Sequence, residues 1–327
     1  MARSENQKTK LLLLLDYLRR ETDEDHPVTT KTLVDYLQSR GVKAERKSVY
    51  SDLTALGDYG YDIQRVPGRT GGVYLGSREF ELPELKLLVD AVQASRFITR
   101  KKSDALIAKL EGLTSRHQAT QLQRQVFVGG RVKSMNESAY YSVDAIHTAI
   151  TQRRLVSFSY FDFTSRKERV DRRGGARYVV APYCLVWDNA QYYLVGREPG
   201  EEVTRHYRVD KMAGVTVTAD PADIPKDFDP GAYVGRYFSM YSGRAAQVRL
   251  SCREELAGVI LDRFGRDVML VPQKGNVEEE GFTVTLDVVV SPQFWGWLTA
   301  LGPQAKLEAP GWAVEEYQNY LQTLLDR

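Results

Sequence analysis

Residues 44–76 read AERKSVYSDLTALGDYGYDIQRVPGRTGGVYLG, and this stretch decides the fold of the N-terminal part of the chain. Val49, Leu53 and Leu56 recur at helical spacing, so they share one apolar stripe that we expect to face a core. Two short strand patterns follow and flank a glycine-rich turn at 67–71. A helix followed at once by a basic hairpin is the order of a winged helix-turn-helix, whose recognition helix enters the major groove of DNA.

Another face of this helix carries the residues that we expect to contact duplex DNA. Basic side chains near the start of a recognition helix reach bases and phosphates, and a tyrosine there can stack on sugar or donate to a phosphate. The hairpin adds an arginine on each side of its tip, and its glycines would let the backbone approach a phosphate closely. The predicted DNA-binding residues are Arg46, Lys47, Ser48, Tyr50, Ser51, Thr54, Arg65 and Arg69.

An ordinary amphipathic helix and a bare hairpin are the alternative interpretations of this stretch. Upstream residues favour DNA binding, because 10–20 and 29–38 both have helical patterns. Thr29 or Thr30 is the expected N-cap of the second helix, and 39–41 ends it. Three helices followed by a basic hairpin are typical of a DNA-binding head.

The whole chain has 327 residues, enough for two to four domains. The leucine run 11–15 is too short to span a bilayer, and no secretory signal pattern is present at the N-terminus. Cys184 and Cys252 lie in apolar, strand-like segments and are expected to be buried thiols. We therefore expect a cytoplasmic, nucleoid-associated protein with no membrane partner.

Charge is distributed unevenly along the chain although the net charge is only +2. Residues 145–180 contain eight Lys or Arg against three Asp or Glu, whereas residues 245–327 contain seven against twelve. Phosphate binding follows local charge, so the basic middle is the better candidate for an anionic ligand. The acidic tail is interpreted as a solvated surface.

Residues 82–124 have the pattern of two helices, the second expected to begin near Ser103. Their apolar surface exceeds what a linker needs. Dimerisation and packing against a neighbouring domain explain it equally well.

A helix at 143–154 precedes five short strand patterns, which together are typical of a small SH3-like or Sm-like barrel. Residues 177–212 read RYVVAPYCLVWDNAQYYLVGREPGEEVTRHYRVDKM and resemble a WYL domain, the Sm-like barrel common in bacterial transcription regulators. The tripeptide that names the family aligns with Tyr192-Tyr193-Leu194, so tyrosine replaces its tryptophan. The later signature of the family matches at Arg205, Tyr207, Arg208, Val209, Asp210 and Lys211.

The head is similar to the winged helix that such regulators carry, at 49–53 and 68–75. Ser51 replaces the usual arginine before the aspartate, and Glu45 replaces the usual serine or threonine N-cap. Both departures concern base preference rather than the fold.

Residues 247–325 follow a βαββαβ order that fits a ferredoxin-like fold, with a further helix at the end. This tail is similar to the extension found after WYL domains. The fold class expected is therefore α+β multidomain. The expected parts are a winged helix-turn-helix DNA-binding domain (1–78), a helical connector and dimerisation region (79–140), a WYL-like Sm-fold sensing domain (141–222), a linker (223–244) and a ferredoxin-like C-terminal extension (245–327).

The resemblance implies that the barrel senses an anionic effector such as a nucleotide or single-stranded oligonucleotide. His206 and Arg208 are two residues apart on one strand, so both should point to the same face of the sheet. Phe158 and Tyr160 have the same spacing on another strand, so basic groups would lie beside exposed rings. The alternative is that the tyrosines pack the barrel and that Asp210 is the partner of Arg208. The predicted effector-binding residues are Tyr160, Tyr183, Tyr193, Arg205, His206, Arg208 and Lys211.

Catalysis is not expected, because the chain has no nucleophile elbow, no metal-spaced histidine pair and no phosphate-binding loop. No cofactor or metal is expected either. The sequence predicts a homodimeric bacterial regulator, more a repressor than an activator, that binds double-stranded operator DNA with half-sites about one helical turn apart. An effector-dependent activator, an RNA- or single-strand-binding module and a nuclease accessory or enzyme remain the alternatives.

Overall fold

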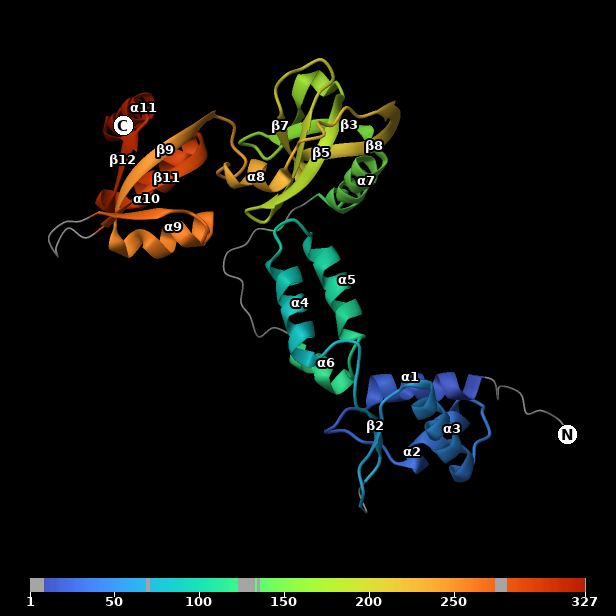
Figure 1. Ribbon diagram of the computed structural model, residues 1–327. Helices are drawn as coiled ribbons and strands as arrows, with labels where there is room; N and C mark the ends of the chain where they lie inside the picture. The colour runs from blue at the N-terminus through green and yellow to red at the C-terminus, as the bar shows by residue number, and fades with distance from the viewer. Residues whose placement is uncertain (1–8, 69–70, 123–132, 134–135, 274–280, 327) are drawn as a thin grey trace. The chain divides into compact units, whose positions relative to one another are not determined.

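The computed structural model describes residues 9–68, 71–122, 133, 136–273 and 281–326 (Figure 1). The chain divides into two compact units, Met1–Glu137 and Ser138–Arg327. We describe each unit by itself. None of the helices in the described part of the chain is long and apolar enough to cross a membrane.

The N-terminal unit begins with three helices and a two-stranded hairpin, which we call the head. The apolar stripes of the three helices meet in one core with the inner faces of the hairpin, and Leu14, Leu33 and Val49 are fully buried there. Thr29 is the N-cap of the second helix and accepts a hydrogen bond from the backbone N–H of Thr32, as one of the two predicted caps. The elements are α1 (Lys10–Glu21), α2 (Thr30–Ser39), α3 (Arg46–Tyr59), β1 (Ile63–Arg65) and β2 (Val73–Leu75).

The connector contains three helices where the sequence predicted two: α4 (Leu82–Ala94), α5 (Arg100–Glu111) and α6 (Arg116–Leu122). The predicted start near Ser103 is wrong. Thr99 caps α5 by accepting from the backbone N–H of Lys102, and Ser103 is buried inside the helix. Leu85, Val89 and Leu122 form the small core between these helices.

Helix α6 is attached to the head by polar contacts. The Ser115 hydroxyl donates to the buried carboxylate of Asp23, in the loop after α1. Arg116 forms an ion pair with Glu21 at 2.8 Å. His117 stacks on His26, with ring centroids 3.7 Å apart and planes 5° apart. The head and α6 therefore share one interface within this unit.

The C-terminal unit opens with α7 (Ala139–Gln152), which packs on a curled antiparallel sheet of six strands (Figure 1). The strand order is β4-β3-β5-β6-β7, and β8 also pairs with β3, antiparallel to it. Short 3₁₀ turns at Arg172–Gly175 and Val209–Lys211 lead into β5 and β8. The strands are β3 (Arg154–Phe163), β4 (Arg169–Asp171), β5 (Tyr178–Asp188), β6 (Gln191–Arg197), β7 (Arg205–Arg208) and β8 (Met212–Pro221).

The segment that the sequence predicted as a linker, 223–244, contains the short helix α8 (Pro230–Gly235) and packs against the sheet up to the start of β9. Phe228 contacts the ring of Tyr183 at 5.2 Å, and Met240 joins the cluster of Val186 and Val195. Phe238 lies instead in the core of the C-terminal layer. We call residues 228–241 the strap, because they join the sheet to that layer.

The last part of the chain is a four-stranded antiparallel sheet in the order β10-β11-β9-β12, with helices packed on it. Val248, Leu250 and Phe294 are among the side chains that fill its core. Strand, helix, strand, strand, helix and strand follow one another as the sequence predicted for this segment. The elements are β9 (Arg244–Arg253), α9 (Ala257–Phe264), β10 (Leu270–Gln273), β11 (Gly281–Val290), α10 (Pro292–Ala300), β12 (Ala305–Ala309) and α11 (Gly311–Leu325).

Candidate nucleic-acid interface

Helix α3 has sharp boundaries that the local sequence explains. At its start, the Ser48 hydroxyl accepts from the backbone N–H of Glu45 and donates to the Glu45 carbonyl. At its end, Gly60 takes the left-handed conformation at φ 115°, which a glycine adopts without strain. Val49 and Leu53, on the predicted stripe, are buried against α1 and α2. The helix is thereby fixed with one face outward.

That outward face carries most of the predicted DNA contacts. Its first turn contains two cations and no acidic residue. The amphipathic pattern thus places a basic face toward solvent at the N-terminal end of the helix, where a recognition helix meets bases. The exposed residues on it are Arg46, Lys47, Tyr50, Ser51 and Thr54.

Tyr50 joins this face to the hairpin. The guanidinium carbon of Arg46 lies 5.8 Å from the ring centroid, and its Nη2 donates to the Tyr50 hydroxyl at 3.3 Å. Arg65, at the end of β1, lies over the same ring at 5.7 Å. Hydrogen bonds with Thr30 and Arg46 lower the pKa of Tyr50 below its usual value. One exposed ring thus holds an arginine of the helix next to an arginine of the hairpin.

Ser48 has a structural role at the start of α3, and its predicted contact with DNA stays a prediction. Besides its contacts to Glu45, its hydroxyl accepts a hydrogen bond of 2.8 Å from the Nζ of Lys10. Lys10 is only 5% exposed and also forms an ion pair with Asp52. The sequence analysis did not identify this buried connection between α1 and α3, because Lys10 was assigned only to the start of a helix.

Two glycines of the hairpin are required by its own backbone packing. A Cβ on Gly72 would lie 2.4 Å from the carbonyl oxygen of Val28, which pairs with Val73 as an additional bridge. A Cβ on Gly71 would lie 2.1 Å from the carbonyl oxygen of Val66. Backbone packing therefore requires glycine at these two positions, and the predicted approach to a phosphate stays a prediction. Gly68 at the tip has open space around it, and the predicted contact Arg69 lies outside the described residues.

In the C-terminal unit, two of the tyrosines predicted to be exposed are buried in packing. Tyr160 is 7% exposed and belongs to a cluster of four rings with Phe158, Tyr178 and Tyr207, whose centroids are 5.4–6.3 Å apart. Burial raises the pKa of Tyr160 to about 12. Tyr183, also 7% exposed, packs under the strap. These two rings are therefore not available to stack on bases.

His206 is also withdrawn from the predicted effector set. Its Nδ1 lies 2.7 Å from the carbonyl oxygen of Met240, and its Nε2 lies 2.9 Å from the hydroxyl of Tyr233. The edge of its ring meets Tyr237, with centroids 4.6 Å apart. Burial lowers the pKa of His206, which favours a neutral imidazole. The strap thus occupies both ring nitrogens of His206, a residue that was predicted to contact the effector.

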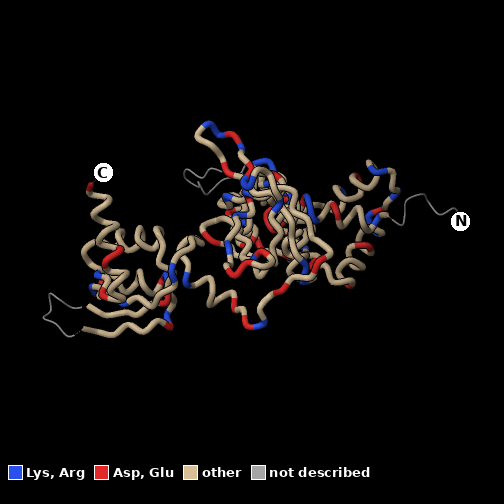
Figure 2. The backbone as a smooth tube through the Cα atoms, turned by 90° about the horizontal axis from the view of Figure 1, so that it is seen from above, with Lys and Arg blue, Asp and Glu red and all other residues tan. Residues whose placement is uncertain are grey.

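Each remaining cation of the predicted set has an acidic partner. Arg208 donates through Nε and Nη2 to the two carboxylate oxygens of Asp210, at 3.1 and 2.8 Å, as the alternative interpretation anticipated. Lys211 pairs with Asp162 at 2.6 Å, and Arg205 with Glu201 at 3.3 Å. Figure 2 shows the same interleaving of basic and acidic residues along much of the backbone. An anion at this face must compete with carboxylates already in place.

Ion-paired side chains nevertheless lie next to the aromatic cluster. We call Arg172, Arg173, Arg208, Lys211 and their partners Asp162, Glu198 and Asp210 the charged belt. Arg172 pairs with Asp162 and lies over Tyr160 at 5.4 Å, and Arg173 lies over Tyr178 at 4.0 Å. Arg173 also donates to both carboxylate oxygens of Glu198, at 2.6 and 2.8 Å. The half-buried Tyr193 is the register partner of Arg208 and lies beside it. The predicted effector-binding residues did not include Arg172 and Arg173, although both lie in the basic segment 145–180 that the sequence indicated.

Comparison with known proteins bears on the C-terminal unit. Residues 142–217 match the sequence model of the WYL domain family, so the predicted WYL domain is confirmed. The match runs from α7 into β8.

Two solved structures resemble the chain at low identity. One is the proteasome accessory factor B/C (PafBC) of Arthrobacter aurescens, with 18% identity, 98% of this chain and 46% of that chain covered, and a TM-score of 0.29. This chain therefore spans less than half the length of that relative. The other is described as a CRISPR Cas-related protein, with 15% identity, 98% and 83% coverage, and a TM-score of 0.37.

Proposed function

We propose that this chain is a bacterial transcription regulator that binds duplex operator DNA through its head and senses an anionic effector through its WYL domain. The observation that carries the proposal is the Tyr50 cluster, in which α3 and the hairpin present Arg46 and Arg65 side by side. A winged helix contacts DNA in two places: its recognition helix enters the major groove, and its hairpin touches the adjacent sugar-phosphate backbone. We favour repression over activation, as the sequence predicted.

DNA recognition in this proposal divides between the two elements. Lys47 and Arg46, at the first turn of α3, contribute phosphate and base-edge contacts because both are exposed and the turn contains no acidic residue. Arg65 contributes a backbone contact from the hairpin. Tyr50 holds the two arginines at a fixed spacing, so DNA meets a preformed surface and less side-chain order is lost on binding.

Effector sensing is assigned to the charged belt around Arg208 rather than to the full predicted residue set. A nucleotide or single strand offers phosphates that can replace the carboxylates of Asp210 and Asp162. Tyr193 is the one predicted tyrosine with partial exposure beside Arg208. A ligand shifts the protein between two arrangements only by binding one of them more tightly, and exchange of these ion pairs supplies such a difference.

A homodimer is part of the proposal, with α4 as the contact. Leu87 is 71% and Leu88 is 38% exposed on this helix, although Leu85 and Val89 are buried in the connector. Adjacent leucines left outside a helical core suit a second, symmetric copy. Sedimentation of the Leu87→Lys variant tests this assignment: the wild type should be dimeric and the variant monomeric.

Competition between nucleic acids tests the main proposal against a single-strand- or RNA-binding module. The full chain is incubated with a pool of random 30-base-pair duplexes and an equal mass of labelled single strands of the same length. We expect the head to select duplexes with a shared sequence, and Arg46→Ala to lose that selection while retaining weak single-strand binding. Exclusive retention of single strands by the wild type would support the alternative, which the belt of arginines over tyrosines favours.

We propose no catalytic activity for the chain. The described residues contain no cluster of three or more side chains suited to hold a metal ion. Incubation of a labelled duplex and a labelled single strand with the protein and Mg²⁺ tests this point, and the substrates should remain intact.

A further inference from the structure

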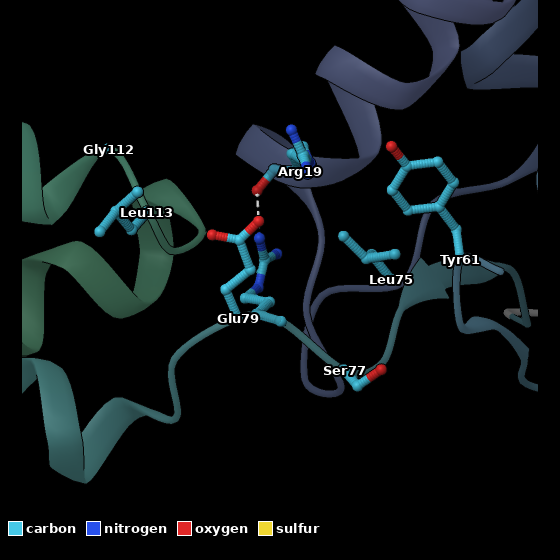
Figure 3. Close-up of a pocket in the computed structure, with 8 residues that line it drawn as sticks. Arg19, Tyr61, Leu75, Ser77, Glu79, Gly112 and Leu113 are labelled. Atoms are coloured by element: carbon cyan, nitrogen blue, oxygen red, sulfur yellow. Dashed lines mark hydrogen bonds between the residues drawn. The ribbon is translucent and has the colours of Figure 1, made fainter.

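A cavity of about 230 Å³ lies within the N-terminal unit, where the head meets the connector (Figure 3). The end of α1 contributes Arg19, and the hairpin contributes Tyr61 and Leu75. The segment after the hairpin contributes Arg78, and the loop between α5 and α6 contributes Leu113. The walls therefore come from both parts of this unit, and a molecule inside would contact both.

Arg78 forms the polar wall of the cavity. Its Nη1 donates to the carbonyl oxygen of Arg19 at 2.8 Å, and its Nη2 donates to that of Thr22 at 2.6 Å. Burial lowers the pKa of this arginine, an effect that the nearby charge of Asp23 opposes. Arg78 forms no ion pair among the residues that the structure describes. A guanidinium has five N–H donors, so donors remain for an acceptor inside the cavity.

Arg19 adds a second positive charge at the rim. It is exposed, and its guanidinium carbon lies 5.6 Å from the ring centroid of Tyr61. In the described part of the chain it has no carboxylate partner within ion-pair distance. Glu79 is the one acidic residue in the lining, so the two arginines outnumber it. The cavity consequently favours an anion.

The remaining walls are apolar. Leu75 is 4% exposed and closes the head side of the cavity, while Leu113 is 41% exposed on the connector side. The flat ring of Tyr61 lies on the same side of the cavity as Leu75, as Figure 3 shows. A ligand that satisfies these walls has a flat apolar body as well as a charged group. The volume lies below the usual 300–1,000 Å³ range of small-molecule sites, which restricts that body to about one ring.

We propose that this cavity is a binding site for a small aromatic carboxylate, with its carboxylate on Arg78 and Arg19 and its ring against Tyr61 and Leu75, opposite Leu113. The site is separate from the charged belt of the WYL domain. The proposal does not rest on the proposed DNA binding, because ligand binding to this cavity is measured without DNA. A bound molecule would fasten the head to the connector at a second place beside the contacts of α6.

Calorimetric titration of the full chain with benzoate tests the proposal. Arg19→Gln removes the exposed charge without touching the hydrogen bonds of Arg78, and Ser77→Trp fills the cavity from an exposed position in its lining. Arg20→Gln is the matched control, because the neighbouring Arg20 is also exposed on α1 but pairs with Asp16 outside the cavity. Circular dichroism of each variant establishes that it is folded.

Benzoate should bind the wild type and Arg20→Gln alike. Arg19→Gln should weaken binding about fivefold, the most that an exposed charge contact usually contributes. Ser77→Trp should abolish it, and neutral benzyl alcohol should not bind the wild type. Absence of benzoate binding up to about 10 mM, where small ligands of weak affinity still bind, would overturn the proposal. Equal binding by Ser77→Trp, or of benzyl alcohol and benzoate, would overturn it as well.

Discussion

The guanidinium of Arg65 in the hairpin lies over the ring of Tyr50 in α3, with its carbon 5.7 Å from the ring centroid. Arg46 approaches the same ring from within the helix at 5.8 Å. The ring therefore sets the distance between the two elements that we assign to the groove and to the backbone. In the proposed DNA binding, we expect Tyr50 to act as a spacer as much as a contact.

Replacing Arg65 with alanine should weaken duplex binding severalfold and lower the salt slope of the affinity by about one, because one phosphate contact is lost. Replacing Tyr50 with alanine should also weaken binding. The double variant should lose less affinity than the two single losses combined, since Arg65 acts through the position that Tyr50 gives it. Fluorescence anisotropy at several salt concentrations measures all three. Strictly additive losses would show that the two residues act independently.

The buried pair of Lys10 and Asp52 should be a main contributor to the stability of the head. Lys10→Met leaves Asp52 without its cation and should lower the free energy of unfolding by at least about 2 kcal/mol, toward the 3–5 kcal/mol typical of broken buried pairs. Asp16→Asn, which removes the exposed pair with Arg20, is the control and should cost less than about 1 kcal/mol. Hydrogen exchange of the amides in α1 and α3 measures both. Equal protection in the two variants would contradict this role.

His206 should make the C-terminal unit less stable in acid. Its pKa is lowered by burial, so the unfolded chain takes up a proton at a higher pH than the folded chain does. The neutral imidazole therefore stabilises the fold fully above the ordinary pKa of about 6.5, and this stability is lost as the pH falls below that value.

Tryptophan fluorescence reports this effect selectively, because all four tryptophans (Trp187, Trp295, Trp297 and Trp312) lie in the C-terminal unit. Urea midpoints at pH 7.5 and 5.5 should differ more for the wild type than for His206→Gln. His147→Gln, on the exposed side of α7, is the matched control and should behave like the wild type. The same pH dependence in His206→Gln would assign the effect to other groups.

Asp210 should compete with an anionic effector for Arg208. Asp210→Asn frees the guanidinium and should raise the affinity for a twelve-nucleotide single strand severalfold, whereas Arg208→Ala should lower it. Arg208→Ala should leave duplex binding by the head unchanged but remove the response to the effector. Anisotropy titrations with the labelled single strand measure the first effect. Weaker binding by Asp210→Asn would place the effector elsewhere.

The order of the elements was largely predictable from the sequence, because helical and strand periodicities are local. The stripe of Val49, Leu53 and Leu56 and the Thr29 cap both lie where the patterns placed them. The start of α5 was misplaced because Ser103 has the residue type of a cap, while Thr99 makes the hydrogen bond. A cap is decided by geometry as well as by residue type.

The site was less predictable because partners distant in sequence decide which side chains are free. Ser48 faces Lys10 from 38 positions away, and His206 is covered by Tyr233 and Met240 of the strap. No periodicity encodes such contacts. The partner of Arg208, in contrast, lies two residues away and was anticipated. The exposed face of α3 was predictable because its amphipathic pattern is entirely local.

The most direct test of the account is the salt-dependent affinity of the full chain for the duplex selected from the random pool. The wild type is compared with the Arg46→Ala, Lys47→Ala double variant, and Arg20→Ala serves as an exposed control on α1. The account predicts that the double variant loses specific duplex binding and that the slope of its residual affinity against salt falls by about two, while the control is unchanged. Unchanged affinity and slope in the double variant would contradict the assignment of α3 as the DNA-reading helix.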